Sequence, residues 1–462
     1  MTEDTIAAIA TPPGSGGIGI VKISGLRSLN IASKIFGKTK KGPEDCSSFE
    51  SHRIVHGYIF DTETGLVLDE VLFVPMLAPR SYTGENIVEI QAHSGNLVMG
   101  LILDRVIKNG ARLAEPGEFT KRAFLNGRID LTQAEAVADI INAKSLEALK
   151  FAASQNLGNF KSIIEESRTK LINLLSVIEV AIDFPGEADE AIFQVHRDQG
   201  INTIRDILTV CRGAVKLYEN AHFLRDGVKL VICGAPNVGK SSLMNRLLER
   251  ERSIVTSLPG TTRDVIEEPL NINGIPFLIS DTAGLHRTDN LVEKIGIERA
   301  KKKIKNSDII LFIKEIGSDV SENEVKKFIP LDKKIIFVIN KIDLLKKDFQ
   351  PDIPEEFKDI PIIKISALHN RGIDLLRETI MELSVKNLKT PSLVVPNLRH
   401  KLALARAVKS LESAEQIFLG NADETLLSID LRSSADALGE ITGDTAGIDI
   451  LDNIFKNFCI GK

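Results

Sequence analysis

The sequence lacks the features of a membrane or secreted protein. No run of about 18 apolar residues occurs in its 462 residues, so we expect no helix that spans a membrane. The first ten residues, MTEDTIAAIA, contain no basic stretch, and we expect no secretory signal there. The four cysteines are scattered without the spacing of metal ligands, which suits a reducing compartment. These absences predict a cytoplasmic protein.

An excess of positive charge is also missing. The formal net charge of −5 argues against bulk attraction to nucleic acid, although it is compatible with a local basic patch. The composition, 43% hydrophobic and 26% charged, is typical of a soluble globular protein. A chain of 462 residues is too long for one hydrophobic core, so we expect two or three domains.

Recognisable catalytic clusters are absent from roughly the first 120 residues. No Ser/His/Asp triad or group of metal ligands can be read there, and we interpret His93 as structural. The glycine-rich segment Thr11–Gly17 either wraps a ligand or is a plain connection, and the local sequence favours the connection. Short β-type runs, among them Ile18–Ile23, Val71–Val74 and Ile87–Gln91, surround it.

The most informative stretch is Val228–Ser241, VKLVICGAPNVGKS. Its first half is a short apolar run of strand type, and Gly234–Ser241 then fits the P-loop pattern G-x-x-x-x-G-K-[ST]. The glycines let backbone N–H groups close around phosphate oxygens at the start of a helix. In this pattern Lys240 reaches the β- and γ-phosphates, and the Ser241 hydroxyl binds Mg²⁺.

Two later segments suit the γ-phosphate and the metal. Gly260–Asp264, GTTRD, begins 20 residues after Lys240, and Thr262 there can complete the Mg²⁺ shell. Asp281–Gly284, DTAG, follows a strand-like run, so its aspartate suits an indirect contact to Mg²⁺ and its glycine N–H suits the γ-phosphate.

Two further segments suit a guanine base. Asp343 of Asn340–Asp343, NKID, can accept from both N1–H and the exocyclic amine of guanine, a pair that adenine does not offer. A backbone N–H at Ser366–Ala367 can donate to guanine O6. Five elements in this order predict a Ras-like GTPase. The predicted nucleotide-binding residues are Asn237, Val238, Gly239, Lys240, Ser241, Ser242, Thr256, Ser257, Leu258, Pro259, Gly260, Thr261, Thr262, Asp281, Thr282, Ala283, Gly284, Asn340, Lys341, Asp343, Ser366, Ala367 and Leu368.

One expected side chain is missing from this set. Ras carries a water-orienting glutamine directly after the DTAG-type segment, whereas this chain has Leu285. Leucine cannot orient water, so another group must. Arg287 and Glu293 are the nearby candidates, and each can equally be a solvated surface charge.

The order of elements predicts a multidomain α+β and α/β protein. Strand-like and helical runs alternate from residue 227 to 386, which predicts a doubly wound, mostly parallel sheet inserted into a helical domain. The expected strands are Lys229–Cys233, Phe277–Ser280, Asp308–Ile313, Lys334–Ile339 and Ile362–Ile365. The expected domains are 1–119, an N-terminal α+β domain; 120–226, the first part of a helical domain; 227–386, the Ras-like domain; and 387–462, the second helical part.

Helical spacing supports the helical domain. Long helices are expected over Phe160–Ile182 and about Val195–Leu224. Thr132 and Glu135 form a predicted capping box with Leu131 and Ala136 as its hydrophobic staple. Two buried stripes are expected, one at Ile164, Leu171, Leu175, Ile178 and Ile182, the other at Leu398, Leu402, Ala405, Val408, Leu411 and Ile417.

With these motifs in place, the chain resembles the MnmE (TrmE) family of tRNA-modification GTPases over essentially its whole length. The resemblance rests on Thr11–Gly14, Arg122–Asn126, Ala181–Pro185, Gly260–Asp264 and the Cys-Ile-Gly-Lys segment Cys459–Lys462. It implies an N-terminal tetrahydrofolate-binding and dimerisation domain, a helical domain, and a G domain inserted in the helical domain.

The resemblance also implies a mechanism. Family members are K⁺-activated GTPases that act as homodimers, with G domains pairing across the dimer. Positions matching Asn237, Thr256, Leu258 and Thr261 bind K⁺, those matching Ser241 and Thr262 bind Mg²⁺, and the one matching Glu293 orients the catalytic water. Lys240, Glu293 and Cys459 are thus the expected catalytic residues.

The family acts on tRNA together with the flavoprotein MnmG, which carries FAD, in a heterotetramer-type complex. It modifies C5 of the wobble uridine to carboxymethylaminomethyl- or aminomethyl-type products with a one-carbon unit from 5-formyltetrahydrofolate or a related folate. The folate contacts match Lys22, Glu85, Arg128 and Lys462. Lys22 stands where family members can carry arginine, which keeps the charge but loses the bidentate fork.

Cys459 has two interpretations from its neighbours alone. A cysteine between Phe458 and Ile460 is usually a small buried hydrophobe. Yet it stands near the chain end, where little core remains to bury it, and the resemblance places this segment at the folate pocket. We therefore expect a role in modification.

Two alternatives remain at this stage. One is a ribosome-assembly switch GTPase of the Era or Der kind, which shares all five nucleotide motifs. The 220 or so residues before the P-loop and the C-terminal segment argue against it, and no GXXG clamp is evident after the G domain. The other is a folate enzyme with a vestigial G domain, which is weakened because every nucleotide motif is intact.

Overall fold

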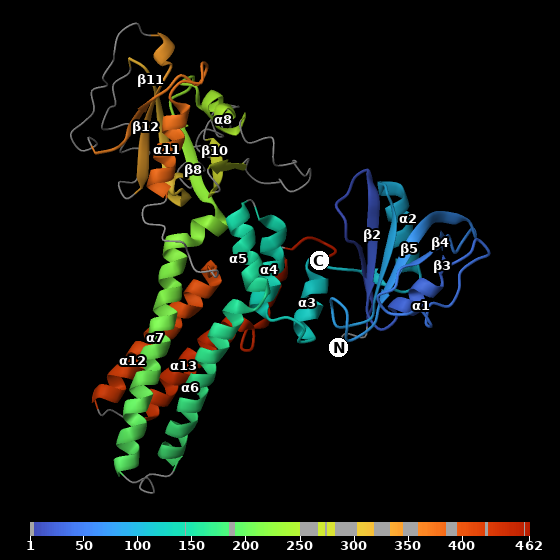
Figure 1. Cartoon of the computed structure of the whole chain (residues 1–462), viewed down its shortest axis with the longest axis horizontal. Coiled ribbons are helices and arrows are strands. Elements are labelled where there is room, and N and C mark those ends of the chain that lie inside the picture. Colours follow the sequence, from blue (N-terminus) through green and yellow to red (C-terminus); the bar gives the residue numbers. More distant parts are fainter. Residues whose placement is uncertain are drawn as a thin grey trace, which may run out of the picture. The chain divides into compact units, whose positions relative to one another are not determined.

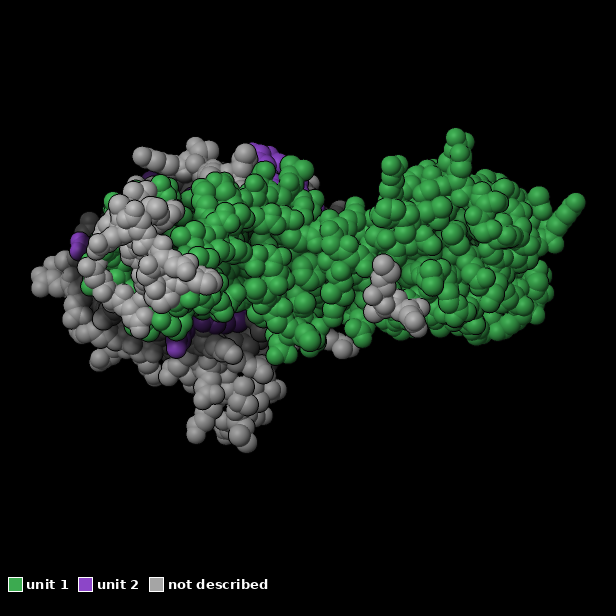
Figure 2. Space-filling model, turned by 90° about the horizontal axis from the view of Figure 1, so that it is seen from below, with its two compact units in different colours: residues 1–138, 155–211, 402–462 green, residues 139–154, 212–401 purple. Residues whose placement is uncertain are grey.

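The structure is a computed structural model that describes residues 4–143, 145–183, 190–249, 267–272, 275–281, 303–317, 333–344, 359–384, 395–420, 424–456 and 458–462. The chain divides into two compact units, coloured in Figure 2. Unit 1 comprises Met1–Ala138, Gln155–Cys211 and Leu402–Lys462, and unit 2 comprises Asp139–Ser154 and Arg212–Lys401. Among the described helices, none combines the length and the hydropathy needed to cross a membrane.

Unit 1 begins with a seven-stranded sheet in the order β3-β4-β5-β6-β2-β1-β7 (Figure 1). Neighbouring strands are antiparallel except β1 and β7, which are parallel. The strands are β1 (Ile6–Ile9), β2 (Gly16–Ser24), β3 (Phe36–Gly37), β4 (Val55–Phe60), β5 (Val67–Met76), β6 (Ile87–Ser94) and β7 (Arg112–Leu113). The expected strand runs are therefore present, each one longer than the sequence suggested.

Two helices cover one face of this sheet, α1 (Ser28–Ser33) and α2 (Asn96–Lys108). Alternate residues of β2, such as Val21 and Ile23, point into the core beneath them, while Lys22 between the two lies on the other face. The strand pattern thus assigns Lys22 to the face opposite α1 and α2.

The helical part of the chain contains long helices that lie side by side (Figure 1), namely α6 (Asn159–Asp183), α7 (Glu190–Asp226), α12 (Leu398–Gly420) and α13 (Glu424–Thr442). Ion pairs join them across large sequence separations: Arg205 of α7 with Glu415 of α12 at 2.6 Å, and Arg432 of α13 with Glu179 of α6. This part of the chain also contains α3 (Glu118–Leu125), α4 (Leu131–Asn142), α5 (Leu146–Asn156) and α14 (Ile448–Phe455).

The predicted capping box of α4 is wrong by two residues. Asp130 Oδ1 accepts from the N–H groups of Thr132 at 2.7 Å and Gln133 at 3.1 Å, and Gln133 Oε1 accepts from the Asp130 N–H at 3.1 Å. The box is therefore Asp-x-x-Gln. Thr132 cannot be the cap because it already lies inside α4, where its hydroxyl donates to the same carboxylate at 2.6 Å.

One of the two predicted stripes is confirmed and the other is mostly wrong. On α6, Ile164, Leu171 and Ile178 are buried as expected, and the other two members, Leu175 and Ile182, are half-buried. On α12, Leu398, Leu402 and Ala405 are exposed. The buried face of α12 carries Ala403, Leu404, Ala407, Leu411 and Ala414. Apolar residues occur in two registers of this helix, and the packed one is rich in alanine, which lets a neighbouring helix approach closely.

Unit 2 contains a six-stranded sheet in the order β13-β12-β11-β8-β10-β9. All neighbouring pairs are parallel except β9 and β10, which form an antiparallel edge. The strands are β8 (Val228–Gly234), β9 (Glu267–Ile272), β10 (Ile275–Asp281), β11 (Ile309–Glu315), β12 (Lys334–Asn340) and β13 (Ile362–Lys364). The mostly parallel sheet and its five expected strands are confirmed, whereas β9 was not predicted.

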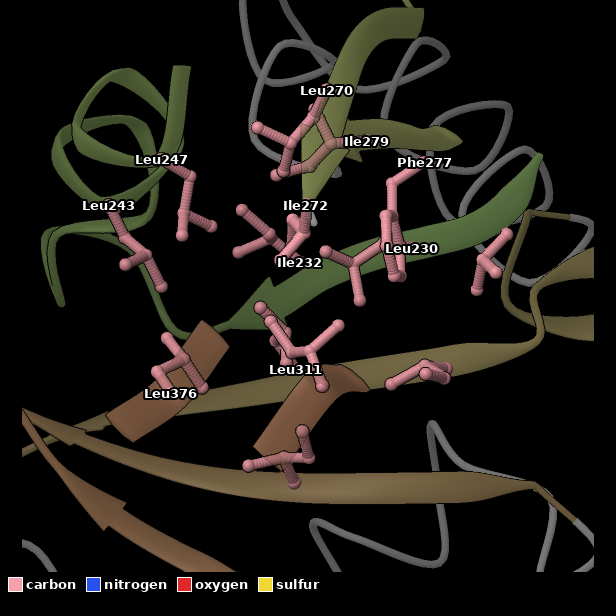
Figure 3. Close-up of a cluster of buried hydrophobic side chains, with 14 of the residues drawn as sticks. Leu230, Ile232, Leu243, Leu247, Leu270, Ile272, Phe277, Ile279, Leu311 and Leu376 are labelled. Carbon is pink, nitrogen blue, oxygen red and sulfur yellow. The ribbon is translucent and has the colours of Figure 1, made fainter. Parts of the chain in front are cut away.

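Helices α8 (Lys240–Glu249) and α11 (Ile373–Ser384) pack on one face of this sheet, and Ile304, in the helical residues 303–306, packs on the other. Figure 3 shows Leu243 and Leu247 of α8 and Leu376 of α11 pointing toward side chains of the sheet. The strands are nearly continuous apolar runs, as expected for a sheet that is buried on both faces. This core holds the carboxyl ends of β8 and β12 next to the start of α8.

Candidate functional site

The P-loop connects β8 to α8 with a backbone that only certain residues can adopt. Gly234, Asn237 and Gly239 have positive φ angles of 151°, 63° and 96°. A Cβ atom on Gly234 would lie 2.2 Å from the Ile313 carbonyl oxygen, and one on Gly239 would lie 2.3 Å from Asn340 Nδ2. Both glycines are therefore required by contact as well as by conformation. The loop ends at the N-terminus of α8, where backbone N–H groups suit an anion.

Lys240 is held over this loop. Its Nζ donates to the carbonyl oxygens of Gly234 at 3.0 Å and Ala235 at 2.7 Å, and its side chain is buried. A buried ammonium group at the mouth of a phosphate-binding loop supplies positive charge where the solvent screens it least. The arrangement suits the binding of a nucleotide polyphosphate.

Asn340, at the end of β12, ties the P-loop to the loop after β13. Its Nδ2 donates to the Val238 carbonyl at 2.8 Å, and its Oδ1 accepts from the Ala367 N–H at 3.0 Å. Asn340 is 3% exposed, so both bonds are shielded from water. We expected a backbone N–H of Ser366–Ala367 to donate to guanine O6, but both already have protein acceptors: the Ala367 N–H donates to Asn340 Oδ1 and the Ser366 N–H to the Arg371 carbonyl at 3.0 Å.

Asp343 lies at the same corner in its charged form. The Ser366 hydroxyl donates to Asp343 Oδ1 at 2.5 Å, and this bond is the main reason that the pKa of Asp343 falls below its usual value. An ionised carboxylate is an acceptor only, which is what the two donors of a guanine edge require. Beside it, Lys341 has a φ of 66°, and its Nζ pairs with Glu315 Oε2 at 2.9 Å.

Of the remaining predicted phosphate and metal contacts, Ser241 and Ser242 lie in the first turn of α8. Asp281 is the last residue of β10. The other residues lie outside the described part of the chain: Thr256, Ser257, Leu258, Pro259, Gly260, Thr261, Thr262, Thr282, Ala283, Gly284, Leu285, Arg287 and Glu293.

A second polar cluster lies in unit 1. Lys22 Nζ is 5.5 Å from the centre of the Tyr82 ring and 5.6 Å from that of Phe119, and the Arg128 guanidinium is 5.2 Å from the Tyr82 ring. Burial lowers the pKa of Lys22 and the charge of Lys462 lowers it further, while Glu89, 3.5 Å away, opposes both. Three of the four predicted folate residues, Lys22, Arg128 and Lys462, are thus near neighbours.

The fourth, Glu85, faces a buried arginine. Glu85 accepts from Ser24 Oγ at 2.8 Å and from Arg122 Nη1 at 3.2 Å. Arg122 is 3% exposed and also donates to Glu118 at 3.0 Å and to Asp4 at 2.9 Å. Arg122 therefore fixes the position of Glu85.

The C-terminal segment is docked beside these residues. The N–H groups of Gly117 and Phe119 donate to the carbonyl oxygens of Cys459 at 3.4 Å and Lys462 at 3.2 Å. Gly461 has a φ of 91°, and a Cβ there would lie 2.6 Å from the Ile9 carbonyl oxygen. The segment is therefore fitted between the end of β1 and the start of α3.

Cys459 differs from the other three cysteines, all of which lie in the described part of the chain. Cys459 is exposed, whereas the others are buried. Burial raises the pKa of Cys46 to about 11 and those of Cys211 and Cys233 to about 12, so their thiols stay protonated and inert. The expectation that little core covers Cys459 is confirmed.

Comparisons with known proteins identify the family. The model described as GTP-binding protein TrmE N-terminus matches residues 5–128, and the model described as MnmE helical domain matches residues 131–459. The chain belongs to the MnmE (TrmE) family of tRNA modification GTPases. This assignment confirms the resemblance, the multidomain fold class and the enzyme class expected from the sequence.

Relatives match the chain from end to end. The tRNA modification GTPase MnmE of Thermoanaerobacter pseudethanolicus is 45% identical over 466 residues, covering 100% of both chains. That of Clostridioides difficile is 45% identical over 469 residues, covering 100% of this chain and 99% of the relative. These full-length matches favour the MnmE family over an Era- or Der-like switch.

Solved structures add little to this assignment. A point variant of Era of Aquifex aeolicus, bound to GDP·AlF₄⁻, aligns with 39% of this chain and 66% of its own at 29% identity, with a TM-score of 0.27. That score is too low to support an argument about this chain.

Sequence reasoning missed two residues of the second cluster in this MnmE-family protein. Tyr82 contacts both Lys22 and Arg128, and Arg122 binds Glu85. Arg122 belongs to the segment Arg122–Asn126 that carried the resemblance, which was a usable signal. Tyr82 offered only its place three residues before Glu85.

Proposed function

We propose that this MnmE-family GTPase is activated by K⁺, depends on Mg²⁺ and acts as a homodimer in the modification of tRNA wobble uridine. The observation that carries the nucleotide half is the set of bonds around Asn340, which joins the P-loop to the loop that follows β13. The ionised Asp343 carboxylate near Asn340 would accept from guanine, and the Lys240 ammonium group over the P-loop would bind the phosphates.

Mg²⁺ would be held by Ser241 and Thr262, whose hydroxyl oxygens are the hard donors that it prefers. K⁺ would be held by Asn237 with oxygens from Thr256, Leu258 and Thr261. In support, Asn237 is exposed on the P-loop, where its carboxamide is open to a ligand. A cation beside the phosphates offsets charge that develops in the transition state, as an arginine finger does. Glu293 would orient the attacking water in place of the missing glutamine.

The folate and tRNA half of the proposal rests on unit 1. Lys22, Arg128 and Lys462 place positive charges close together, beside the aromatic ring of Tyr82. The positive charges suit the glutamate tail of a folate, and the ring suits its flat ring system. An accessible thiol, Cys459, lies on the segment docked beside them. The one-carbon unit of 5-formyltetrahydrofolate or a related folate would be used there, with MnmG as the FAD-bearing partner. The domain boundaries of 1–119, 120–226, 227–386 and 387–462 belong to this proposal.

The cation test uses the purified full-length chain. GTP turnover should be about tenfold or more faster in K⁺ than in Na⁺ at equal ionic strength, and Asn237→Ala should remove the difference. Equal turnover of the wild-type protein in both salts would refute K⁺ activation.

The modification test uses a strain that lacks the protein. Mass analysis of its tRNA nucleosides should show loss of the C5-modified wobble uridine, and complementation should restore it. A complete set of modified nucleosides in the deletion strain would refute the tRNA half of the proposal.

A further inference from the structure

Arg246 contacts the loop that follows β13, although none of the nucleotide motifs includes it. We call residues Ser366–Arg371 the base loop; two hydrogen bonds between its end residues close it, at 3.0 and 3.2 Å. Arg246 lies on α8, and its Nε donates to the Ala367 carbonyl at 3.1 Å while its Nη2 donates to the Leu368 carbonyl at 3.1 Å. The helix that begins with Lys240 therefore also holds the base loop.

These two bonds fix the direction of a backbone N–H. A peptide unit is planar and trans, so its C=O and N–H point in opposite directions. Since the Ala367 carbonyl points at Arg246, the Leu368 N–H of the same peptide points away from Arg246. The Arg246 guanidinium thereby sets the orientation of this peptide plane.

Two residues of the base loop, Leu368 and Asn370, have N–H groups that no acceptor among the described residues binds, and only the peptide of Leu368 is held by Arg246. The Ala367 N–H donates to Asn340 Oδ1 at 3.0 Å, and the His369 N–H donates to Ser366 Oγ at 3.2 Å. Within the described residues the Leu368 N–H has no protein acceptor. The base loop, which contacts Asp343 through Ser366 Oγ, thus leaves the Leu368 N–H available to a ligand in a direction that Arg246 sets.

We propose that Arg246 is a positioning residue for guanine recognition, which aims the Leu368 N–H at O6 of the bound base. The inference rests on the guanine site of the proposed function. Arginine suits the task because its planar fork offers several donors in fixed directions and so binds two carbonyl oxygens at once. A lysine would place one compact ammonium there and could not fix both carbonyls equally.

The test compares two nucleotides that differ only at position 6 of the base. 6-Thioguanosine diphosphate keeps N1–H and the 2-amino group but replaces O6 by sulfur, a weak acceptor. Arg246→Ala should weaken GDP binding about tenfold and 6-thio-GDP binding much less, so the preference for GDP shrinks. The preference for GDP over IDP, which lacks the 2-amino group read by Asp343, should stay at its wild-type value. Arg246→Lys should fall between wild type and Arg246→Ala.

Arg377 offers a matched control. From α11 its Nη2 donates to the Leu247 carbonyl of α8 at 2.9 Å, so it also ties α8 to a neighbour. Arg377→Ala should leave the ratio of GDP to 6-thio-GDP affinity unchanged.

Several outcomes would overturn the inference. These are unchanged GDP affinity in Arg246→Ala, equal weakening of GDP and 6-thio-GDP, and the same shift in Arg377→Ala. If Arg246→Ala fails to fold, Arg246→Lys is the deciding variant. A preference for GDP over 6-thio-GDP in Arg246→Lys that equals the wild-type value would refute the role of the arginine guanidinium. Failure of the wild-type protein to prefer GDP to ADP would instead refute the guanine site itself.

Discussion

Asp343 is the side chain to which the proposed function assigns the choice of base. The Ser366 hydroxyl holds its carboxylate in the charged form, ready to accept from two donors. Asp343→Asn should therefore lower GTP affinity by at least about a hundredfold and create affinity for xanthosine triphosphate, because the amide can donate to the xanthine oxygen. Equilibrium binding of both nucleotides measures this, with Asp359→Asn, at an exposed carboxyl of the same unit, as the control. Unchanged GTP affinity would mean that the base binds elsewhere.

Glu293 carries the second prediction at this scale. Because Leu285 replaces the glutamine of Ras, Glu293→Ala should lower kcat about a hundredfold with little change in nucleotide affinity. Arg287→Ala, at the other charged candidate, should keep wild-type turnover. The measurement is single-turnover GTP hydrolysis together with GDP binding. Normal GTP hydrolysis by Glu293→Ala would mean that Glu293 is a solvated surface charge with no role in catalysis.

Most residues of the nucleotide corner could be named from the sequence because each motif follows a strand and the parallel strands end at one edge of the sheet. Asn340, Lys240 and Asp343 were found in this way. Arg246 was not, because its hydrogen-bond partners are backbone carbonyls of a loop 121 residues away, and no local pattern encodes those partners. Tyr82 was missed as well, because the residues that its ring contacts, Lys22 and Arg128, are far from it in the sequence.

Some strands of the fold could be predicted from the sequence and others could not. Long apolar runs such as those of β8 and β11 were located because burial on both faces leaves an unbroken hydrophobic signal. β9, with the sequence EEPLNI, was missed because its charges and its proline argue against a strand. An edge position tolerates both, since one side of the strand has no ladder bonds to lose.

The cap of α4 yields a prediction about this element. Asp130→Ala removes the acceptor of two N–H groups and should destabilise the first turn of α4 by about 1 kcal/mol. Hydrogen exchange measured by mass spectrometry should then be faster over Leu131–Ala134. Asp130→Asn is the matched control, because asparagine caps a helix almost as well as aspartate does. Protection as high in Asp130→Ala as in wild type would contradict the assigned cap.

For the molecule as a whole, the helical bundle depends on segments that are far apart in the chain. Arg168 of α6 pairs with Asp444 at 3.1 Å across 276 positions, and α6 packs on α13. The sequence indicated that the bundle is formed by two separate segments of the chain. Apolar residues follow helical spacing up to the P-loop and do so again after the inserted sheet. The sequence did not reveal which register of α12 packs, since two apolar stripes competed.

The proposal assigns GTP hydrolysis to unit 2 and the folate-dependent modification of tRNA to unit 1. One substitution should therefore abolish the modification and leave GTP hydrolysis intact. Cys459→Ser should keep GTP hydrolysis and the fold but abolish wobble-uridine modification, because serine is nearly isosteric and a far weaker nucleophile. The paired measurement is GTP turnover of the purified variant and the modified-nucleoside content of tRNA in a complemented deletion strain. Cys211→Ser, at a buried cysteine, is the control. Wild-type modification by Cys459→Ser would refute a chemical role for the sulfur.

The contrast among the four cysteines has a practical consequence. With three thiols shielded in the interior and one open to solvent, a maleimide dye should attach at a single site without any engineered cysteine. The fluorophore would sit on the docked C-terminal segment, beside Gly117 and close to the cluster around Lys22. The native protein thus carries its own attachment point for a spectroscopic reporter of events in unit 1.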